Sequence, residues 1–308
     1  MPDLDVVTGA FSYTGRAIAE RLLAQGRAVR TLARRDAPDD PLSTRIEQAP
    51  LQFRDPAALA GNLRGALVLY NTYWIRFERG ESTFARAVEN TRVLFRAAAE
   101  AGVERVVHVS VTNAAEDSQF AYFRGKAELE REVAASGLPH AIVRPTLVFG
   151  REDVLVNNIA WILRRFPFFL VPGDGAYRVQ PVSVEDTAAI CVAAAATARG
   201  QTLDAAGPDT YRFDELVRLV AEAVGSRARI LHSSRSVALA LSGLVGRMRR
   251  DVVLTCDELG GLMASLLVSD GPPRGRERFG EWLRQEGDRL GRRYVSELAR
   301  NFRPYAPL

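Results

Sequence analysis

The chain is poor in three residue types that often carry chemistry. It has two cysteines, three histidines and a single lysine among 308 residues. Cys191 and Cys256 are too few for a disulfide framework or a cysteine-rich metal site. His108, His140 and His232 lie far apart in sequence, and no two of them have the spacing of paired helical metal ligands. The composition therefore predicts no metal centre and a reducing compartment.

Long apolar runs and dense basic tracts are also missing. The longest apolar stretch, Val237 to Gly246, is shorter than the about 20 residues that span a bilayer. The 41 basic residues nearly balance the 37 acidic ones and are spread along the chain, which argues against nucleic-acid binding. The first residues, Met1 to Asp5, are acidic and lead directly into an apolar strand, unlike a signal peptide. We expect a cytoplasmic protein without a membrane span.

What remains is ordinary globular composition, 47% hydrophobic and 25% charged. From Leu4 to about Gly150, short runs of Val, Ile or Leu alternate with turns and helical patterns. The expected strands are Leu4–Val7, Ala28–Leu32, Leu51–Phe53, Ala66–Tyr70, Val106–Val109 and Ala141–Val143. The expected helices, each closed by a glycine, are Gly15–Ala24, Ala57–Leu63, Thr83–Ala101 and Tyr122–Ser136. Continuous apolar strands joined by helical crossovers predict a doubly wound parallel α/β sheet.

The pattern changes after Gly150. One more strand, Leu203–Ala206, could return to the sheet. The other segments are mostly helical, with candidates at Val156–Arg165, Phe213–Val224, Asp257–Leu267 and Arg278–Phe302. We therefore expect residues 1–150 to form a dinucleotide-binding core to which 178–206 return. Residues 151–177 and 207–308 are expected to form a smaller, mostly helical lobe on the substrate side.

A glycine-containing turn follows the first expected strand and opens the first helix. It reads Thr8-Gly9-Ala10-Phe11-Ser12-Tyr13-Thr14-Gly15. Gly9 permits the tight turn out of the strand, and Gly15 lets the helix approach the strand. The first helical amides can hold a pyrophosphate, although Ser12 stands where a middle glycine is common. The residues expected to bind a dinucleotide here are Gly9, Phe11, Ser12, Tyr13, Thr14 and Gly15.

From this turn onward the chain resembles the short-chain dehydrogenase/reductase superfamily, in its extended and atypical branches. Those branches include nucleotide-sugar epimerases and dehydratases, NmrA-like regulators and the Rossmann-type accessory subunit of complex I. The resemblance covers nearly the whole chain and rests on the order and spacing of Thr8–Gly15, Asn90, Tyr122-Phe123-Arg124-Gly125-Lys126, Arg144-Pro145, Asn157-Asn158, Pro172-Gly173-Asp174-Gly175 and Val184-Glu185-Asp186. It implies a Rossmann fold that binds a nicotinamide dinucleotide and a small-molecule substrate. The oligomeric state is left open, with a homo-oligomer as one option.

Tyr122 and Lys126 are four residues apart, which places both on one face of a helix. In the resembled family the tyrosine exchanges a proton with the substrate oxygen. The lysine binds the nicotinamide ribose and favours the phenolate, because a nearby positive charge lowers the pKa of a phenol. Lys126 is the only lysine, and of the eight tyrosines only Tyr122 has a basic residue four places on. We therefore interpret Tyr122 and Lys126 as catalytic, against the alternative of an incidental pair on a solvated helix face.

The resembled family has a catalytic hydroxyl just past its fifth strand, and this chain departs from that pattern. Aligning Ser110 with the first serine of the usual pair puts Val111 where the catalytic Ser or Thr is expected. Strand alternation points Ser110 and Thr112 to the face opposite Val111, so either hydroxyl could substitute, or neither. His108, inside the same apolar strand, is interpreted as a core residue.

The end of the fourth expected strand is the second candidate for contact with ligands. Asn71 and Thr72 could line the nicotinamide, and Tyr73 and Trp74 could wall an apolar substrate, because ligands bind at the carboxyl ends of such strands. Packing of these aromatics under the second lobe is the alternative. The family likeness implies that Asn90 ties its helix to neighbouring backbone. It also implies that Asn157-Asn158 meets a substrate diphosphate in sugar-modifying relatives.

The choice between NAD and NADP depends on the end of the second strand. An acidic residue about 20 positions past the glycine turn favours NAD, because it accepts from the ribose 2′-hydroxyl. This stretch instead carries Arg34 and Arg35, with no carboxylate before Asp36. Arg34, assisted by Arg35, is therefore expected to meet a 2′-phosphate, which predicts NADP(H) over NAD(H). Plain surface cations are the alternative.

Three functions of different classes follow. The first is an NADP(H)-dependent oxidoreductase of a small organic carbonyl or alcohol, with Tyr122 as general acid/base and Lys126 as its partner. The second is a nucleotide-sugar epimerase or dehydratase, which the displaced hydroxyl at Val111 and the arginine at Arg34 disfavour. The third is a non-catalytic binding or assembly protein, which needs no proton donor. The Tyr122 and Lys126 pair therefore favours the first.

Overall fold

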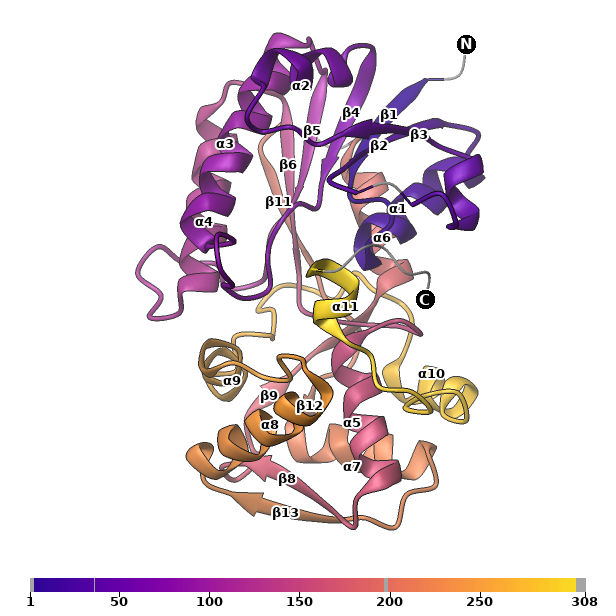
Figure 1. Cartoon of the computed structure of the whole chain (residues 1–308), viewed down its shortest axis with the longest axis vertical. Coiled ribbons are helices and arrows are strands. Elements are labelled where there is room, and N and C mark those ends of the chain that lie inside the picture. Colours follow the sequence, from indigo (N-terminus) through magenta and orange to yellow (C-terminus); the bar gives the residue numbers. More distant parts are fainter. Residues whose placement is uncertain (1–2, 36, 197–198, 303–308) are drawn as a thin grey trace. The chain divides into compact units, whose positions relative to one another are not determined.

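The computed structural model describes residues 3–35, 37–196 and 199–302, which form two compact units (Figure 1). Unit 1 comprises the described residues up to Pro145 together with Thr187–Ala205. Unit 2 comprises Thr146–Asp186 and the described residues from Ala206 onward.

Unit 1 is built on a seven-stranded parallel sheet in the order β11-β6-β5-β4-β1-β2-β3. Its strands are β1 Leu4–Thr8, β2 Ala28–Ala33, β3 Glu47–Pro50, β4 Ala66–Asn71, β5 Arg105–Val109, β6 His140–Pro145 and β11 Gln201–Ala205. β11 pairs with β6, which confirms the expected return of a strand from the later sequence. This is the doubly wound Rossmann arrangement that the alternating pattern predicted.

Helices cover both faces of this sheet (Figure 1). α2 Pro56–Leu63, α3 Phe84–Glu100 and α4 Ala121–Ala135 pack side by side on one face, and α1 Tyr13–Ala24 and α6 Val184–Ala194 lie on the other. A short 3₁₀ helix, η1 Pro41–Thr44, precedes β3. The glycines expected to close the first four helices all have left-handed φ values of 74° to 80°, at Gly26, Gly65, Gly102 and Gly137. The sheet and the α2–α4 layer enclose a core that includes fully buried Val6, Leu59, Leu69, Leu94 and Val106.

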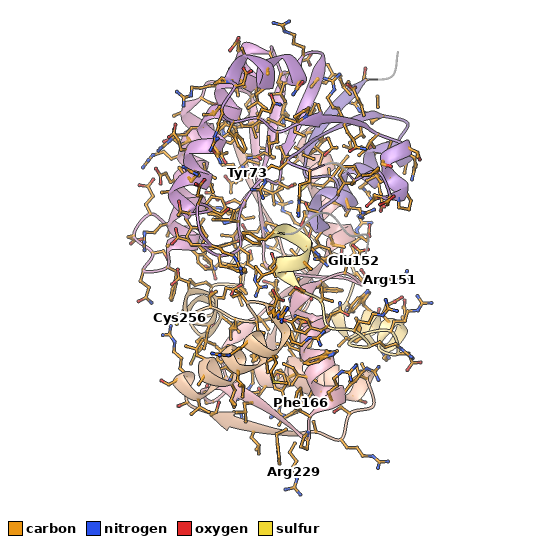
Figure 2. The ribbon with its side chains drawn as sticks, viewed as in Figure 1. Tyr73, Arg151, Glu152, Phe166, Arg229 and Cys256 are labelled. Atoms are coloured by element: carbon orange, nitrogen blue, oxygen red, sulfur yellow. The ribbon has the colours of Figure 1, made fainter. Side chains whose placement is uncertain are left out.

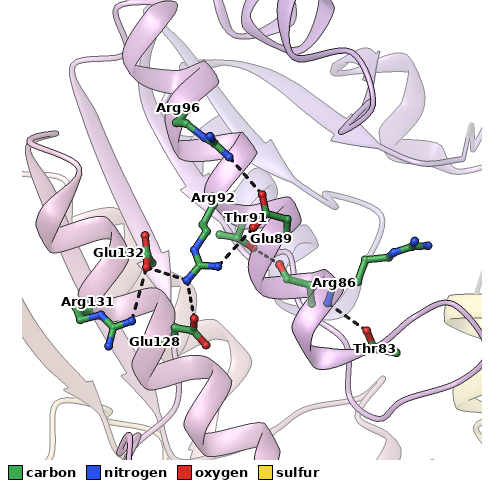
Figure 3. Close-up of polar contacts among 10 residues, drawn as sticks. Thr83, Arg86, Glu89, Thr91, Arg92, Arg96, Glu128, Arg131 and Glu132 are labelled. Carbon is green, nitrogen blue, oxygen red and sulfur yellow. Dashed lines mark hydrogen bonds and ion pairs between the residues drawn. The ribbon is translucent and has the colours of Figure 1, made fainter.

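An ion-pair network joins α4 to α3 (Figure 3). The Arg92 guanidinium on α3 is 2.6 Å from a Glu128 carboxylate oxygen and 3.0 Å from one of Glu132, both on α4. These contacts lower the pKa of Glu132 below its ordinary value, the hydrogen bond from Arg92 being the main cause. A network of several charges contributes more to stability than an isolated surface pair does. α4, which carries Tyr122 and Lys126, is thus held in place on its α3 side.

Unit 2 combines helices with three two-stranded ribbons. Its strands pair as β7 Leu147–Phe149 with β10 Pro181–Ser183, β8 Phe168–Pro172 with β13 Arg229–Ser233, and β9 Arg178–Val179 with β12 Tyr211–Arg212. Its helices are α5 Val154–Arg165, α7 Phe213–Ala223, α8 Arg235–Arg249, α9 Cys256–Met263, α10 Phe279–Glu286 and α11 Glu297–Phe302. The core gathers side chains of α5, α7 and α10, including Leu163, Leu216, Val220, Phe279 and Leu283. The later part of the chain is helical as expected, with ribbons that the sequence pattern did not indicate.

Two expected elements were wrong. The third strand covers Glu47–Pro50, not Leu51–Phe53, because Leu51 is a buried loop residue that follows the edge strand. The single helix expected over Arg278–Phe302 is two helices, α10 and α11. Gly291 lies in the turns between them with φ of 66°, and a Cβ there would stand 2.4 Å from backbone atoms of α5. A continuous helix cannot pass through that conformation.

Two negative findings apply to the described residues. None of their helices combines the length and apolar character that crossing a membrane requires. They also contain no group of three or more His, Cys, Asp or Glu side chains arranged to hold a metal ion.

Candidate functional site

The turn after β1 and the end of β4 meet where the strand order reverses. β1 lies between β4 and β2, so later strands are added on opposite sides of it. Thr72, which follows β4, donates from its hydroxyl to the Thr8 carbonyl at 2.5 Å, and its amide donates to Thr8 Oγ1 at 2.7 Å. Ligands of doubly wound sheets bind beyond the strand ends at such a point. The structure therefore places the glycine turn at the expected ligand-binding edge.

The backbone of the turn is tightly fixed. Gly9 has φ of 68°, which favours glycine, and a Cβ on Gly15 would lie 2.2 Å from the Gly9 carbonyl oxygen. The Ser12 hydroxyl donates back to that same carbonyl at 2.6 Å and does not cap α1. The first turn of α1 also contains no acidic residue. A helix N-terminus without a side-chain cap or a carboxylate in its first turn favours an anion.

Two arginines follow β2. Arg34 is exposed and Arg35 is partly buried. Burial lowers the pKa of Arg35, and the neighbouring charge of Arg34 adds to this shift. In the next loop the buried Asp40 pairs with Arg16 in the second turn of α1 and accepts from the Leu42 amide at 2.8 Å. The charge of the Asp40 carboxylate is thus balanced by Arg16, and this ion pair ties the loop after β2 to α1.

Lys126 is buried, with 3% of its surface exposed. Its ammonium donates to the Val109 carbonyl at the end of β5, at 2.8 Å, and lies 4.9 Å from the centre of the Trp74 ring. Burial lowers the pKa of Lys126 to about 7, and the nearby Glu130 carboxylate opposes this shift. Glu130 itself is held by a bidentate pair with Arg144 of β6. α4 is thus fixed to the ends of β5 and β6 through both Lys126 and Glu130.

Tyr122 stands one turn before Lys126 on α4, within a cluster of aromatic rings. Its ring meets Trp74 edge-on at 5.9 Å and Phe84 at 6.1 Å between centroids. Trp74 also lies against the helix backbone, because a Cβ added to Gly125 would be 2.7 Å from the indole. The indole therefore contacts the α4 surface that carries both Tyr122 and Lys126. Trp74 therefore packs within unit 1, against the candidate catalytic pair Tyr122 and Lys126.

The hydroxyls after β5 are buried. Ser110 is 5% exposed, and its Oγ has no hydrogen-bond partner among the described residues. Thr112 is 1% exposed, and its amide donates to the Pro145 carbonyl at 3.0 Å. Val111, at the position expected for the catalytic hydroxyl, is buried as well. A role for either hydroxyl in catalysis stays a prediction.

Asn71 and His108 form a buried pair within the sheet. Asn71 Nδ2 donates to His108 Nδ1 at 3.0 Å, and Asn71 Oδ1 accepts from the Tyr73 amide at 3.1 Å. Burial, together with the charges of Lys126 and His140, lowers the pKa of His108 well below its usual value. His108 is therefore a neutral core residue. The Asn71 amide is engaged within the sheet, and its contact with a cofactor stays a prediction.

The three other asparagines that the family likeness singled out have partners that the sequence did not indicate. They are Asn90, Asn157 and Asn158. Asn90 donates to the Tyr73 hydroxyl at 2.8 Å, and not to neighbouring backbone. In unit 2, Asn158 donates to and accepts from the Val295 backbone, both at 3.0 Å. Asn157 donates to the carbonyls of residues 151 and 153. Both amides are thus occupied by backbone of unit 2.

One residue that fixes the turn was missed by sequence reasoning. Thr31 on β2 is completely buried; its hydroxyl donates to the Val7 carbonyl and accepts from the Ala10 amide, both at 3.0 Å. A threonine within an otherwise apolar strand beside the glycine turn was the available signal. The contact of Trp74 with Gly125 had no signal in the sequence, because it joins residues about 50 positions apart.

The buried lysine predicts a specific dependence of stability on pH. Its pKa is about 7 in the folded chain but about 10 when unfolded, so between these values only the unfolded chain keeps the proton. Wild-type stability therefore gains a contribution that increases as pH rises from about 7 to about 10. Relative to that of Lys126→Met, we expect the free energy of unfolding of the wild type to increase by about 2–4 kcal/mol between these two pH values. Below pH about 7 the difference in unfolding free energy between the two proteins should be constant.

Urea unfolding of both proteins across this pH range measures the effect. Other titrating groups are common to both chains and cancel in the difference. A difference in unfolding free energy that stays flat between pH about 7 and about 10 would contradict the buried-amine assignment.

Sequence comparisons show what this chain is similar to. Residues 9–160 match a family model described as NAD(P)H-binding. The chain is 26% identical over 285 residues to the mitochondrial NADH dehydrogenase (ubiquinone) 1 alpha subcomplex subunit 9 of Arabidopsis thaliana, a match that covers 86% of this chain and 70% of that protein. In its first half the chain is thus similar to NAD(P)H-binding proteins.

Solved structures with the same fold include enzymes. The NADPH-dependent quinone oxidoreductase of Escherichia coli in complex with NADPH has a TM-score of 0.70 and 20% identity, covering 87% of this chain and 91% of that one. A nucleoside-diphosphate-sugar epimerase of Staphylococcus aureus has a TM-score of 0.70 and 15% identity, covering 96% of this chain and 99% of that one. At these identities the likeness establishes a shared fold and no more.

Proposed function

We propose that the protein is an NADP(H)-dependent oxidoreductase that acts on a small organic carbonyl or alcohol. The observation that carries the proposal is the pair on α4: the only lysine of the chain is buried against the end of β5, one turn after Tyr122. In this proposal unit 1 is the dinucleotide-binding domain. Unit 2 supplies the substrate side, and the place of action is the cytoplasm.

The residues at the strand ends fit a dinucleotide. The α1 N-terminus, which has no side-chain cap and no carboxylate in its first turn, would hold a pyrophosphate, and Phe11, Ser12, Tyr13 and Thr14 would surround it. Arg34 and Arg35 would meet the phosphate on the adenine ribose, and Lys126 the nicotinamide ribose. When bound, NADP(H) would supply or accept the hydride.

The side chains of the chain itself would handle the proton. Tyr122 would give its hydroxyl proton to a substrate oxygen in reduction, or take it in oxidation. The ammonium form of Lys126 would stabilise the phenolate by its charge. The Ser110 Oγ, buried and without a partner among the described residues, is the better placed of the two hydroxyls to donate to the substrate oxygen. The aromatic rings around Tyr122 would exclude water from this step.

Cofactor choice gives the next prediction. If Arg34 and Arg35 contact a 2′-phosphate, charge-assisted bonds predict about 10-fold to 150-fold tighter binding of NADPH than of NADH. Arg34→Ala should remove most of that preference and leave NADH affinity nearly unchanged. Isothermal titration of each cofactor measures both effects. Arg96→Ala, an exposed arginine on α3, is the matched control and should keep the preference.

The catalytic proposal is tested by following NADPH absorbance near 340 nm with a panel of quinones, aldehydes and ketones. We expect consumption that depends on both the acceptor and the protein. Tight NADPH binding without turnover on any member would instead favour the second candidate.

That second candidate is a non-catalytic dinucleotide-binding protein. It is favoured by Trp74, whose indole lies against Gly125 and under the Lys126 ammonium, where a substrate would approach the pair. Similarity to a protein named as a complex I subunit points the same way. The epimerase alternative is less favoured, because Asn157 and Asn158 are held by backbone of unit 2.

A further inference from the structure

The exposed apolar side chains are concentrated in one part of unit 2. Every large hydrophobic side chain that is exposed among the described residues falls between residues 166 and 248. Four of them belong to α8: Val237, Leu241, Leu244 and Met248, with exposed fractions from 43% to 69%. Their spacing of four, three and four residues aligns them along one side of the helix. We call these four residues the α8 stripe.

The helix is anchored so that the α8 stripe faces outward. Its buried positions are the small residues Ala238 and Gly246, and a Cβ on Gly246 would lie 2.6 Å from the Asp251 carbonyl oxygen. Near its end, the Arg249 guanidinium lies over the Tyr294 ring at 5.0 Å and over the Trp161 ring at 5.5 Å. The small buried residues and the aromatic contacts hold α8 on unit 2 and leave its apolar side uncovered.

The segment that carries the stripe has charge of one sign. From Ser226 to Arg250 the chain has no Asp or Glu, and its arginines are Arg227, Arg229, Arg235, Arg247, Arg249 and Arg250. The other three exposed large hydrophobics, Phe166, Phe168 and Leu231, lie in or beside the β8–β13 ribbon, against which α8 packs. Figure 2 shows Phe166 and Arg229 at that ribbon.

The apolar stripe and the arginines of the same segment together indicate which kind of partner fits this surface. A second copy of the same surface would bring two sets of arginines together without a carboxylate from this segment to pair with them. Nucleic acid would neutralise the arginines but offers no match for four aliphatic or thioether side chains. An anionic lipid surface satisfies both features, since its headgroups attract arginine and its acyl boundary accepts the apolar side of a helix lying in its plane.

We propose that unit 2 docks on anionic phospholipid membranes, with the α8 stripe entering the acyl boundary and the surrounding arginines contacting headgroups. The membrane is bound at its surface and is not crossed. This proposal is independent of the oxidoreductase reaction.

Sedimentation of the full chain with lipid vesicles tests it. We expect binding to phosphatidylcholine vesicles containing about 30% phosphatidylglycerol, and weaker binding when salt rises from about 0.1 M to about 0.5 M. Leu241→Ser with Leu244→Ser should weaken binding by at least about 10-fold, because it removes the apolar contact. Arg247→Gln should weaken it by about five-fold, whereas Arg96→Gln on α3 should not.

Three results would overturn the proposal. The first is no binding of the wild type to anionic vesicles. The second is equal binding to pure phosphatidylcholine and to anionic vesicles. The third is a wild-type dimer in gel filtration that Leu241→Ser with Leu244→Ser converts to monomer, because the stripe would then be covered by a second copy. Unchanged circular dichroism and thermal unfolding of the double variant serve as the check that it is folded.

Discussion

Replacing Tyr122 by phenylalanine is expected to lower turnover of an identified substrate by about 100-fold to 10,000-fold, the usual contribution of a general acid or base. The substitution removes only the proton-bearing oxygen. The edge-on contacts of the ring with Trp74 and Phe84 are retained, so α4 keeps its position. NADPH affinity should therefore change little. Steady-state rates at 340 nm, together with calorimetric affinity, separate the two effects.

Tyr177→Phe is the matched control for this variant. Tyr177 belongs to unit 2, is 7% exposed, and its hydroxyl has no hydrogen-bond partner among the described residues. Removing that hydroxyl should leave turnover unchanged. A Tyr122→Phe protein that keeps more than about a tenth of the wild-type rate would remove Tyr122 from the proton transfer.

Gly15→Ala is expected to abolish measurable dinucleotide binding. The new Cβ would stand 2.2 Å from the Gly9 carbonyl oxygen and 2.8 Å from its carbon, both in backbone that cannot rotate away. α1 must then move from the turn, and its N-terminal amides leave the place where a pyrophosphate would bind. Calorimetric titration with NADPH measures the loss.

Gly61→Ala is the matched control, since Gly61 is also helical and a Cβ there meets no atom within 4 Å. It should keep wild-type affinity and equal or higher stability. Circular dichroism of both variants shows whether unit 1 is folded. Wild-type affinity in a folded Gly15→Ala protein would mean that the turn is only structural.

The alternating pattern of the first 150 residues predicted the sheet because its strands are buried on both faces. Such strands appear in sequence as continuous apolar runs, and the glycines that end the helices mark their limits. Glu47–Pro50 escaped notice because it is an edge strand that pairs only with β2, begins with two polar residues and has no buried residue. The ribbons of unit 2 have two to five residues per strand, too few for a period to show.

The candidate site was predictable where its parts are close in sequence. Tyr122 and Lys126 are one helical turn apart, and Gly9 and Gly15 belong to one turn, so spacing alone relates them. The contact of Trp74 with Gly125 and the hydrogen bond of Asn71 to His108 each join distant segments. They exist only because β4, β5 and α4 pack together, which no local pattern specifies.

In the proposed function, unit 1 binds NADP(H) in preference to NAD(H) at the turn after β1. Calorimetric titration of the full chain with NADPH and with NADH tests this preference. We expect binding of both cofactors, with NADPH tighter by about 10-fold to 150-fold. Absence of binding, or NADH binding as tight as NADPH or tighter, would contradict it.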